Sequence, residues 1–334
     1  MHKIKVDFFQ RRPRPGFSFS IEHIFDDVRR RLADRIEASV HISPCYNDGY
    51  FTKLVNIVSA GFKQGKSVTH ITGEVHFLNL LMRKQRTILT IHDCGMMARK
   101  TGPAKKLVQW LYLTGPVKKA AVVTTVSEAT KQQVIAYTRV NPDKVVVIPV
   151  AVNAMFQPSP KAFNKQKPVI LQIGTSYNKN LEKVIAALAG VPCHLSIIGQ
   201  LSADQLTALE THHIDYGNEY NITDERLLEK YQQCDLLLFA STAEGFGMPI
   251  IEANAVEKPV VTSNLSSMPE VAGNAACLVD PFDVDDIRRG ILEVINNDAY
   301  REELISCGRL NKLRFDGNKV ARSYYSLYEQ LDNK

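Results

Sequence analysis

The stretch "DLLLFASTAEGFGMPIIEANA", residues 235–255, indicates how this chain is built. It begins as a continuous apolar run, turns at the glycines of residues 244–247 and continues from Pro249 as a helix. An apolar strand, a glycine turn and a helix in this order are typical of a parallel sheet that is covered on both faces. The stretch also carries two glutamates, Glu244 and Glu252, and the second falls on the otherwise apolar helix.

The same alternation of apolar runs and amphipathic segments extends outward in both directions. Residues 20–36, for example, place Phe25, Val28 and Leu32 on one helical face. The runs that we expect to be strands are residues 3–9, 86–93, 120–127, 144–152, 169–176, 194–199, 234–241, 259–264 and 275–280. The sequence therefore predicts a two-domain α/β protein with parallel sheets and a cleft between the domains.

Length and composition support this division. A chain of 334 residues exceeds what one core usually organises. We assign residues 1–150 to an N-terminal domain and the polar, proline-rich residues 151–168 to a linker. Residues 169–316 form a C-terminal domain, and residues 317–334 form a helix that we expect to pack back across the domain junction.

Several classes of protein are disfavoured by the sequence. No apolar run approaches the roughly 20 residues of a membrane-spanning helix. No secretory signal is visible, and the six cysteines form no C-x-x-C pair, so we expect a cytoplasmic protein with reduced thiols.

The charge is divided unevenly. Residues 1–150 carry 24 basic and 11 acidic side chains, whereas the remainder carries 17 and 24. A nucleic-acid-binding protein would explain the basic half through phosphate contacts, but not the acidic half or its two glutamates. We therefore expect no nucleic-acid partner, and different partners for the two halves.

Polar clusters follow the predicted strands, where ligands of open α/β sheets bind. Lys179 lies shortly after one strand, Glu244 after another, and His92 directly after a third. Glycine amides at a helix start and a lysine suit phosphates, and an ionised glutamate suits the paired hydroxyls of a sugar or a ribose. This set of groups indicates a nucleotide-sugar site.

At residues 235–281 the sequence closely resembles the retaining GT-B glycosyltransferases of family 4. The shared motifs are the E-x7-E pair, the G-F-G-x-P turn, "PVVTSN" and "MPEVAG". Weaker similarity covers most of the chain, and the branch resembled is that of mannosyl- and rhamnosyltransferases. The resemblance implies two Rossmann-like domains facing a cleft, with the donor held by the C-terminal domain and the acceptor by the N-terminal one.

The resemblance also implies roles for individual residues. Glu244 would face the donor sugar, Glu252 would accept from the ribose, Lys179 would bind the diphosphate and His92 would lie near the transferred sugar. The catalytic candidates are thus Glu244, His92 and Lys179. The donor-binding candidates are Gly174, Thr175, Lys179, Gly245, Phe246, Gly247, Met248 and Glu252.

Two positions depart from the family pattern. Many relatives have an arginine where this chain has Thr175, and the branch resembled has a basic residue where this chain has Asn178. A non-catalytic subunit that binds sugar nucleotides is therefore an alternative to a transferase. For a transferase we expect a UDP-, GDP- or dTDP-sugar as donor, no cofactor and no metal ion, because the donor half has no Asp-x-Asp after a strand.

A basic, aromatic segment at residues 99–119 has two interpretations. Leu107, Val108, Leu111 and Tyr112 face the core in the first. In the second, the segment with Trp110 and its lysines binds an anionic membrane surface, at the inner face of the cytoplasmic membrane, and meets a lipid-linked saccharide acceptor.

Overall fold

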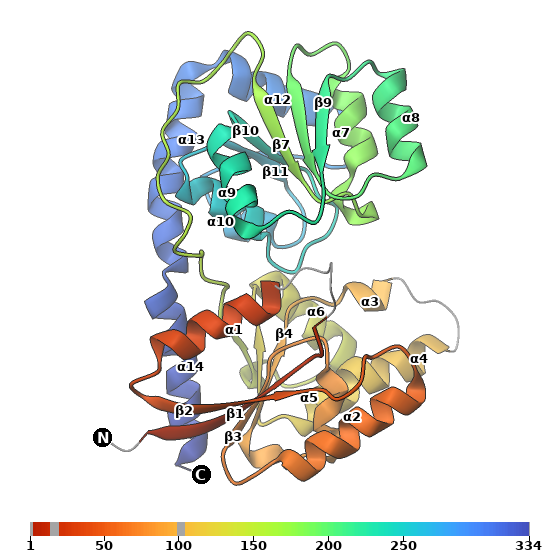
Figure 1. The fold of residues 1–334 in the computed structure, drawn as a ribbon, viewed down its shortest axis with the longest axis vertical. Coiled ribbons are helices and arrows are strands. Elements are labelled where there is room, and N and C mark those ends of the chain that lie inside the picture. The colour runs from red at the N-terminus through yellow and green to blue at the C-terminus, as the bar shows by residue number, and fades with distance from the viewer. Residues whose placement is uncertain (1–2, 14–19, 99–103, 334) are drawn as a thin grey trace. The chain divides into compact units, whose positions relative to one another are not determined.

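The computed structural model describes residues 3–13, 20–98 and 104–333. Two compact units divide the chain, and the C-terminal residues return to the first of them (Figure 1). One unit comprises Met1–Ala151 with Gly317–Lys334, and the other comprises Val152–Asp316. Of the basic segment at residues 99–119, residues 99–103 and the side chain of Lys105 lie outside the described part.

The N-terminal unit contains a parallel sheet of six strands in the order β2-β1-β3-β4-β5-β6. The strands are β1 (Ile4–Gln10), β2 (Ile36–Ile42), β3 (Val68–Ile71), β4 (Thr87–Ile91), β5 (Val122–Thr125) and β6 (Val145–Val147). The direction in which the chain crosses the sheet reverses between β1 and β3. Such a reversal is where open α/β sheets bind ligands.

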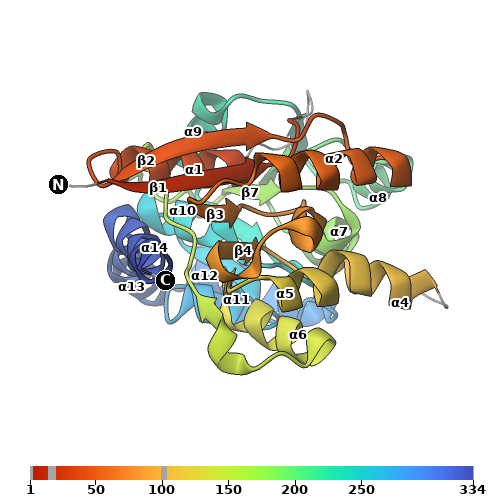
Figure 2. The same cartoon turned by 90° about the horizontal axis from the view of Figure 1, so that it is seen from below.

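Helices cover both faces of this sheet, with α14 on one side and α2 and α5 on the other (Figure 2). The helices are α1 (Ser20–Arg31), α2 (Tyr50–Lys63), α3 (Gly95–Ala98), α4 (Ala104–Gln109), α5 (Gly115–Lys119), α6 (Glu128–Thr138) and α14 (Gly317–Asp332). The short turns are the 3₁₀ helices η1 (His76–Leu81), η2 (Lys84–Arg86) and η4 (Pro142–Lys144) and the π-helical η3 (Trp110–Thr114). The apolar face of α1 packs with α14, because Phe25, Val28 and Leu32 share one core with that helix.

A buried polar network joins α14 to the sheet. His70 of β3 hydrogen-bonds with the Tyr328 hydroxyl at 2.8 Å and, through its other ring nitrogen, with Thr90 at 2.8 Å. Thr90 and Thr124 share a further hydrogen bond of 2.7 Å. These contacts fix the rotation of α14 on the sheet, because a buried polar group without its partner costs about 1–3 kcal/mol.

The C-terminal unit contains a second parallel sheet of six strands, in the order β12-β11-β10-β7-β8-β9. The strands are β7 (Val169–Ile173), β8 (His194–Ile198), β9 (Tyr216–Glu219), β10 (Leu236–Phe239), β11 (Val260–Ser263) and β12 (Cys277–Val279). In chain order this is the doubly wound Rossmann arrangement, with its switch point between β7 and β10. The predicted α/β class with two Rossmann-like units is confirmed.

The helices of this unit surround its sheet. They are α7 (Leu181–Leu188), α8 (Ala203–Thr211), α9 (Asp224–Gln233), α10 (Met248–Ala255), α11 (Met268–Ala272), α12 (Val284–Asn296) and α13 (Asp298–Asn311), with 3₁₀ turns η5 (Tyr177–Lys179) and η6 (Lys312–Phe315). Asp283 begins α12 as its cap, because its side chain accepts hydrogen bonds from the amides of Asp285 and Asp286.

Residues 152–168, which the sequence predicts to be a linker, belong to the C-terminal unit in the structure. Phe156 is buried and its ring meets Tyr231 edge to face, with the centroids 5.3 Å apart. Lys161 forms an ion pair of 2.8 Å with the buried Asp235. The segment therefore packs along this unit before it enters β7.

Candidate active site

The loops after β7 and β10 bring together two of the predicted site residues, Lys179 and Glu244. Lys179 Nζ lies 2.6 Å from Glu244 Oε1. Asn178 donates to the same oxygen at 3.2 Å, and the ammonium group of Lys179 lies 4.6 Å from the centroid of the Phe239 ring. Because β7 and β10 are neighbours at the switch point of the sheet, this ion pair lies where the topology predicts a ligand.

Gly174 makes room for the lysine. It follows β7 with a φ of +86°, and a Cβ built there would lie 2.9 Å from the side-chain carbons of Lys179. A larger residue at this position would be strained and would displace the lysine. The part of Gly174 in the site is therefore to let the Lys179 side chain pass over the backbone.

The loop that holds Glu244 is fixed by two serines that the sequence analysis missed. Ser266 donates to the Glu244 carbonyl at 2.7 Å, and Ser267 donates to the Phe246 carbonyl at 2.6 Å. Phe246 is buried with its ring edge to face with Phe315. The turn at Gly245 and Gly247 is thus anchored by the loop between β11 and α11 and by η6. Gly247 adopts a φ of +109° directly before Met248 begins α10.

Glu252 has surroundings quite different from those of Glu244. It lies on α10, is 7% exposed and accepts a hydrogen bond of 2.6 Å from the Tyr231 hydroxyl of α9. Burial raises the pKa of Glu252 to about 7, although the bond from Tyr231 and the charge of Lys179 oppose this shift. Tyr231 is a further residue that the sequence analysis missed, since its position in "LLEKYQQ" is that of an ordinary core residue.

Thr175 and Asn178, the two departures from the family pattern, are both engaged within the unit. The Thr175 hydroxyl donates to the Gln200 carbonyl at 2.6 Å. Asn178 bonds to Glu244 and to the Ala243 carbonyl. Neither position supplies a basic side chain here, and Lys179 is the one basic residue of the described loop after β7.

His92 belongs to the other unit and directly follows β4. Its Nε2 lies 2.8 Å from the Thr72 carbonyl, which can only accept, so Nε2 carries the proton and Nδ1 is an acceptor. Loss of water around the ring lowers the pKa of His92. Gly73, with a φ of +132°, is required here because a Cβ would lie 2.5 Å from the ring.

Arg11 and Glu74 lie close to the histidine at the switch point of the N-terminal sheet. Arg11 forms ion pairs with Glu22 at 2.7 Å and with Glu74 at 2.6 Å. Glu74 has a φ of 55°, a left-handed conformation that non-glycine residues seldom adopt. Its exposed carboxylate is held beside a neutral imidazole, and such a pair can accept hydrogen bonds from sugar hydroxyls.

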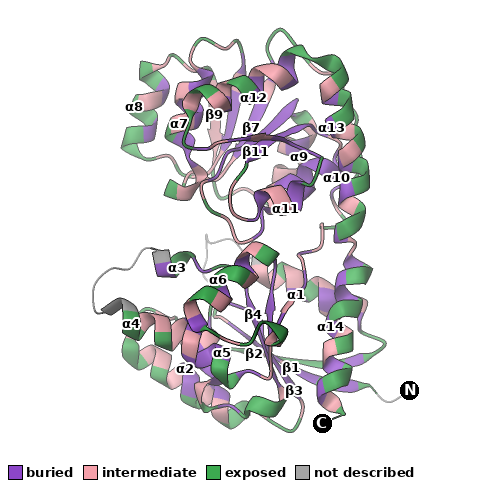
Figure 3. Ribbon diagram, turned by 180° about the vertical axis from the view of Figure 1, so that it is seen from behind, coloured by how far each residue is buried: buried purple, intermediate pink, exposed green. Residues whose placement is uncertain are grey.

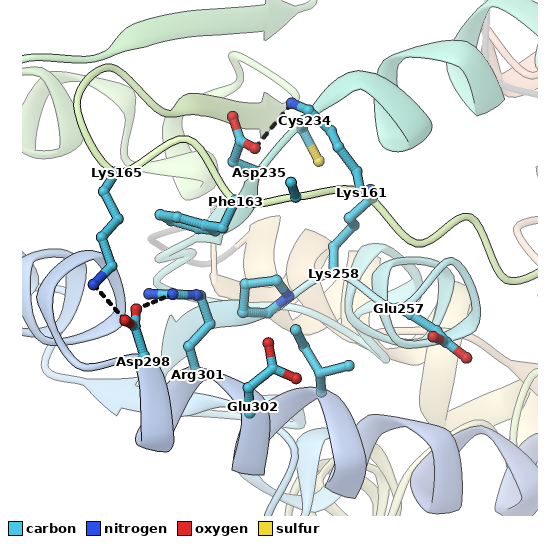
Figure 4. Close-up of a pocket in the computed structure, with 13 residues that line it drawn as sticks. Lys161, Phe163, Lys165, Cys234, Asp235, Glu257, Lys258, Asp298, Arg301 and Glu302 are labelled. Carbon is cyan, nitrogen blue, oxygen red and sulfur yellow. Dashed lines mark hydrogen bonds and ion pairs between the residues drawn. The ribbon is translucent and has the colours of Figure 1, made fainter.

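A cavity of about 300 Å³ in the C-terminal unit is lined by Asp235, Lys258 and Arg301, among other residues (Figure 4). Its lining includes Asp235 and Pro259, which precede β10 and β11 and so mark the amino ends of the strands. Lys161 pairs with Asp235 there, and Lys165 pairs with Asp298. These ion pairs hold residues 152–168 in place, so we assign the cavity to packing.

Among the residues that the structure describes, no group of three His, Cys, Asp or Glu side chains is arranged to hold a metal ion. The absence of a metal requirement remains a prediction that only an activity measurement tests.

Comparison with known proteins identifies the family. The model of the glycosyl transferases group 1 matches residues 155–310, and that of glycosyltransferase family 4 matches residues 27–155. The O-antigen chain mannosyltransferase B of Escherichia coli is 24% identical over 278 residues, which are 75% of this chain and 71% of that protein.

A second relative, the serotype-specific mannosyltransferase WbdA of Escherichia coli, is 28% identical over 211 residues, which are 56% of this chain. The matched part is only 26% of the length of WbdA. Among solved structures, the sucrose-phosphate synthase of Thermosynechococcus elongatus superposes with a TM-score of 0.79 at 15% identity, covering 98% of this chain and 99% of that one. Together, the two family models and the shared fold show that this chain belongs to the GT-B glycosyltransferases of family 4.

Proposed function

We propose that this glycosyltransferase moves a hexosyl residue, with mannosyl as the leading candidate, from a nucleoside-diphosphate sugar to a saccharide or lipid-linked acceptor. We further propose that the anomeric configuration is retained. The observation that carries the proposal is the Lys179–Glu244 ion pair at the switch point of the C-terminal sheet. Mannosyl is favoured because both relatives described above are named as mannosyltransferases.

The two members of this ion pair have complementary tasks in the proposal. Lys179 offers positive charge to the diphosphate, and Glu244 accepts from hydroxyls of the donor sugar. In the structure the two side chains pair with each other. A bound donor would replace this ion pair with one contact to Lys179 from the diphosphate and one to Glu244 from the sugar. Asn178 continues to orient Glu244 when the lysine turns to the phosphates.

Glu252 and the start of α10 would hold the rest of the nucleotide. The ribose hydroxyls would donate to the Glu252 oxygens, and the amides at the start of α10 would face phosphate oxygens. Tyr231 keeps the buried carboxylate in a fixed orientation. His92, neutral and with Nδ1 as an acceptor, is proposed to accept a hydrogen bond from the transferred sugar.

In the proposed step, the bond between the anomeric carbon and the diphosphate oxygen breaks while the acceptor oxygen attacks the same face of the sugar. The acceptor proton passes to the departing phosphate oxygen, which is close to the attacking hydroxyl. The contribution of the protein is to position both substrates and to stabilise the charge that develops on the phosphate. No carboxylate is required as a nucleophile, and we propose that no metal ion is needed.

Two measurements test this function. A thermal-shift screen with GDP-mannose, UDP-glucose and dTDP-rhamnose should show stabilisation by one donor, with GDP-mannose expected. Proton NMR of the product formed from that donor should then show the anomeric configuration of the donor. An inverted product would rule out the front-face step, and stabilisation by none of the donors would contradict the nucleotide-sugar site.

We propose that the partners are a nucleotide sugar and a saccharide, with no nucleic acid. The acidic C-terminal half would repel a polyanion, whereas the basic N-terminal half suits an anionic surface. We propose a cytoplasmic protein that is peripheral at the inner face of the cytoplasmic membrane. Binding of anionic vesicles but not of duplex DNA at physiological salt would support this assignment, and preferential binding of DNA would contradict it.

A further inference from the structure

Helix α2 of the N-terminal unit carries an apolar stripe that no described part of the protein covers. The α2 stripe consists of Phe51, Leu54, Val58 and Phe62, which are 77%, 56%, 37% and 85% exposed. Their spacing of three and four residues places them on one side of the helix. Leu81 lies beside Gly61 and is itself 62% exposed, which widens the apolar surface.

The opposite side of α2 packs against the core of the N-terminal unit. Asn56, Ile57 and Ala60 are buried. The Asn56 side chain accepts a hydrogen bond from the Cys45 amide and donates one to the Cys45 carbonyl. Figure 3 shows the turns of α2 largely as exposed and intermediate residues on the outside of the unit. A helix that is apolar on both sides is usually covered on both sides, so the stripe indicates a further binding partner.

The charge around the stripe indicates what kind of partner this is. From just before α2 to the end of η2, residues 48–86 include six basic side chains and two acidic ones, Asp48 and Glu74. Neither acid is on α2 or on η1, which packs beside it. Lys63 and Lys66 are exposed at the end of α2, and Lys53 lies at its start, between the rings of Tyr50 and Tyr112.

We propose that the α2 stripe lies in the interface of a bilayer that is rich in anionic lipid. Aromatic and aliphatic side chains flanked by lysines, with no acidic residue on the helix, are what an interfacial helix requires. A second copy of the chain fits less well, because pairing through α2 would bring two basic surfaces together. No helix of the described ranges is long and apolar enough to cross a membrane.

This inference moves the membrane contact away from the place that the sequence indicated. In the segment at residues 99–119, Val108, Leu111 and Tyr112 pack against the core, and Leu107 and Trp110 are 60% and 52% exposed. Residues 99–103 of that segment lie outside the described part of the chain. The α2 stripe offers a larger apolar surface, and Leu107 and Trp110 become a second, smaller contact.

The proposed function supplies only the purpose of this membrane contact, which is to bring the acceptor-binding unit to a lipid-linked saccharide. Its test needs no substrate. Flotation with vesicles of phosphatidylglycerol and phosphatidylethanolamine should show binding, and purely zwitterionic vesicles should bind far less. Binding should also fall steeply at about 1 M NaCl, where the screening length is about 3 Å.

Three variants locate the contact. Phe51→Ser with Phe62→Ser should lower the partition coefficient at least about tenfold. Lys53→Gln, Lys63→Gln and Lys66→Gln together should lower it about fivefold for each charge removed. The matched control is Leu310→Ser with Leu313→Ser, which removes two leucines of the C-terminal unit that are 69% and 55% exposed and should leave binding unchanged.

A spectroscopic measurement covers the case in which the serine variant does not fold. Trp110 is the single tryptophan, so Phe62→Trp combined with Trp110→Phe reports on α2 alone. The emission of this double variant should shift to shorter wavelength on anionic vesicles and should be quenched by brominated lipid. Emission that vesicles leave unchanged, unaltered flotation of the lysine variant, or a dimer in solution that the serine variant dissociates would each overturn the proposal.

Discussion

The C-terminal unit buries a carboxylate, that of Glu252, in its candidate site, whereas the N-terminal unit encloses imidazoles, among them that of His70. Burial raises the pKa of Glu252 to about 7 and lowers that of His70 to about 3 and that of His76 to about 4. The cause is the same in both units, because a poorly hydrated site favours the neutral form. Burial therefore raises the pKa of the carboxyl group and lowers that of the imidazoles.

The consequence is that the stabilities of the two units should respond oppositely to pH between about pH 5 and about pH 7. Folded Glu252 binds a proton more tightly than the unfolded chain does, so stability falls as pH rises from about 4.5 to 7. Folded His70 binds a proton less tightly, so stability falls as pH decreases from about 6.5 to 3. The C-terminal unit thus carries a stability cost at the pH where its carboxylate is ionised, and such a cost is common at functional sites, which agrees with the binding role proposed for Glu252.

The largest effect on activity is expected for Glu244, which is proposed to contact the donor sugar. Glu244→Gln removes the charge that holds Lys179 and, as proposed, the donor sugar, so kcat should fall about 30-fold to 1000-fold. Steady-state kinetics with the preferred donor measures this. Glu210→Gln, at an exposed position on α8, is the matched control. A kcat within about threefold of the wild type would place the chemistry away from the ion pair.

The next effect separates binding from stability at Glu252. Glu252→Gln should weaken nucleotide binding about 10-fold to 100-fold, because a charged acceptor for the ribose is lost. The same variant should raise the free energy of unfolding at pH 8 by up to about 3 kcal/mol, and leave it unchanged near pH 4.5. Calorimetric titration and chemical denaturation measure the two effects. A variant that is less stable at pH 8 would mean that Glu252 serves the fold.

A smaller effect is expected when whole-protein unfolding is followed as a function of pH. Between about pH 5 and about pH 7 the transition of the N-terminal unit should move to higher temperature, and that of the C-terminal unit to lower temperature. Differential scanning calorimetry resolves this if the units unfold separately. Over this interval His70→Gln should remove up to about 2 kcal/mol of pH dependence from the first transition only. Parallel movement of both transitions would contradict the contrast between the units.

The smallest effect is expected from removing metal ions. The helix start at α10 and Lys179 are proposed to carry the charge of the leaving group, so EDTA should change kcat by less than about twofold. Dialysis against EDTA, followed by an assay with and without added Mg²⁺ or Mn²⁺, measures this. Loss of activity that Mn²⁺ restores would show that Lys179 does not suffice.

The sequence predicted best the strands that are mostly apolar and mostly buried. β4, β7 and β10 are of this kind, and all three were expected. The edge strands β2 and β9 were missed because most of their side chains are exposed or half-buried, and β3 was missed because Thr69 and His70 interrupt its run. Their placement depends on neighbouring strands and on α14, which local sequence does not contain.

The residues of the candidate site that belong to a sequence motif could be predicted. Glu244, Glu252 and Lys179 were found because their spacing follows the family pattern, and the structure brings Lys179 and Glu244 into contact. Tyr231, Ser266 and Ser267 were missed because each acts through a partner on another element. Residues of this kind become visible only when the fold brings distant loops together.

The position of α14 has a consequence for synthesis of the chain. A growing polypeptide emerges at about 5–20 residues per second, and its first domain usually folds first. Here the N-terminal unit lacks Tyr324 and Tyr328 of its core until the end of α14 has left the ribosome, whereas residues 152–316 already hold their whole unit. We expect the second unit to become protease-resistant first on stalled nascent chains. Earlier protection of residues 1–151 would show that the sheet folds without its last helix.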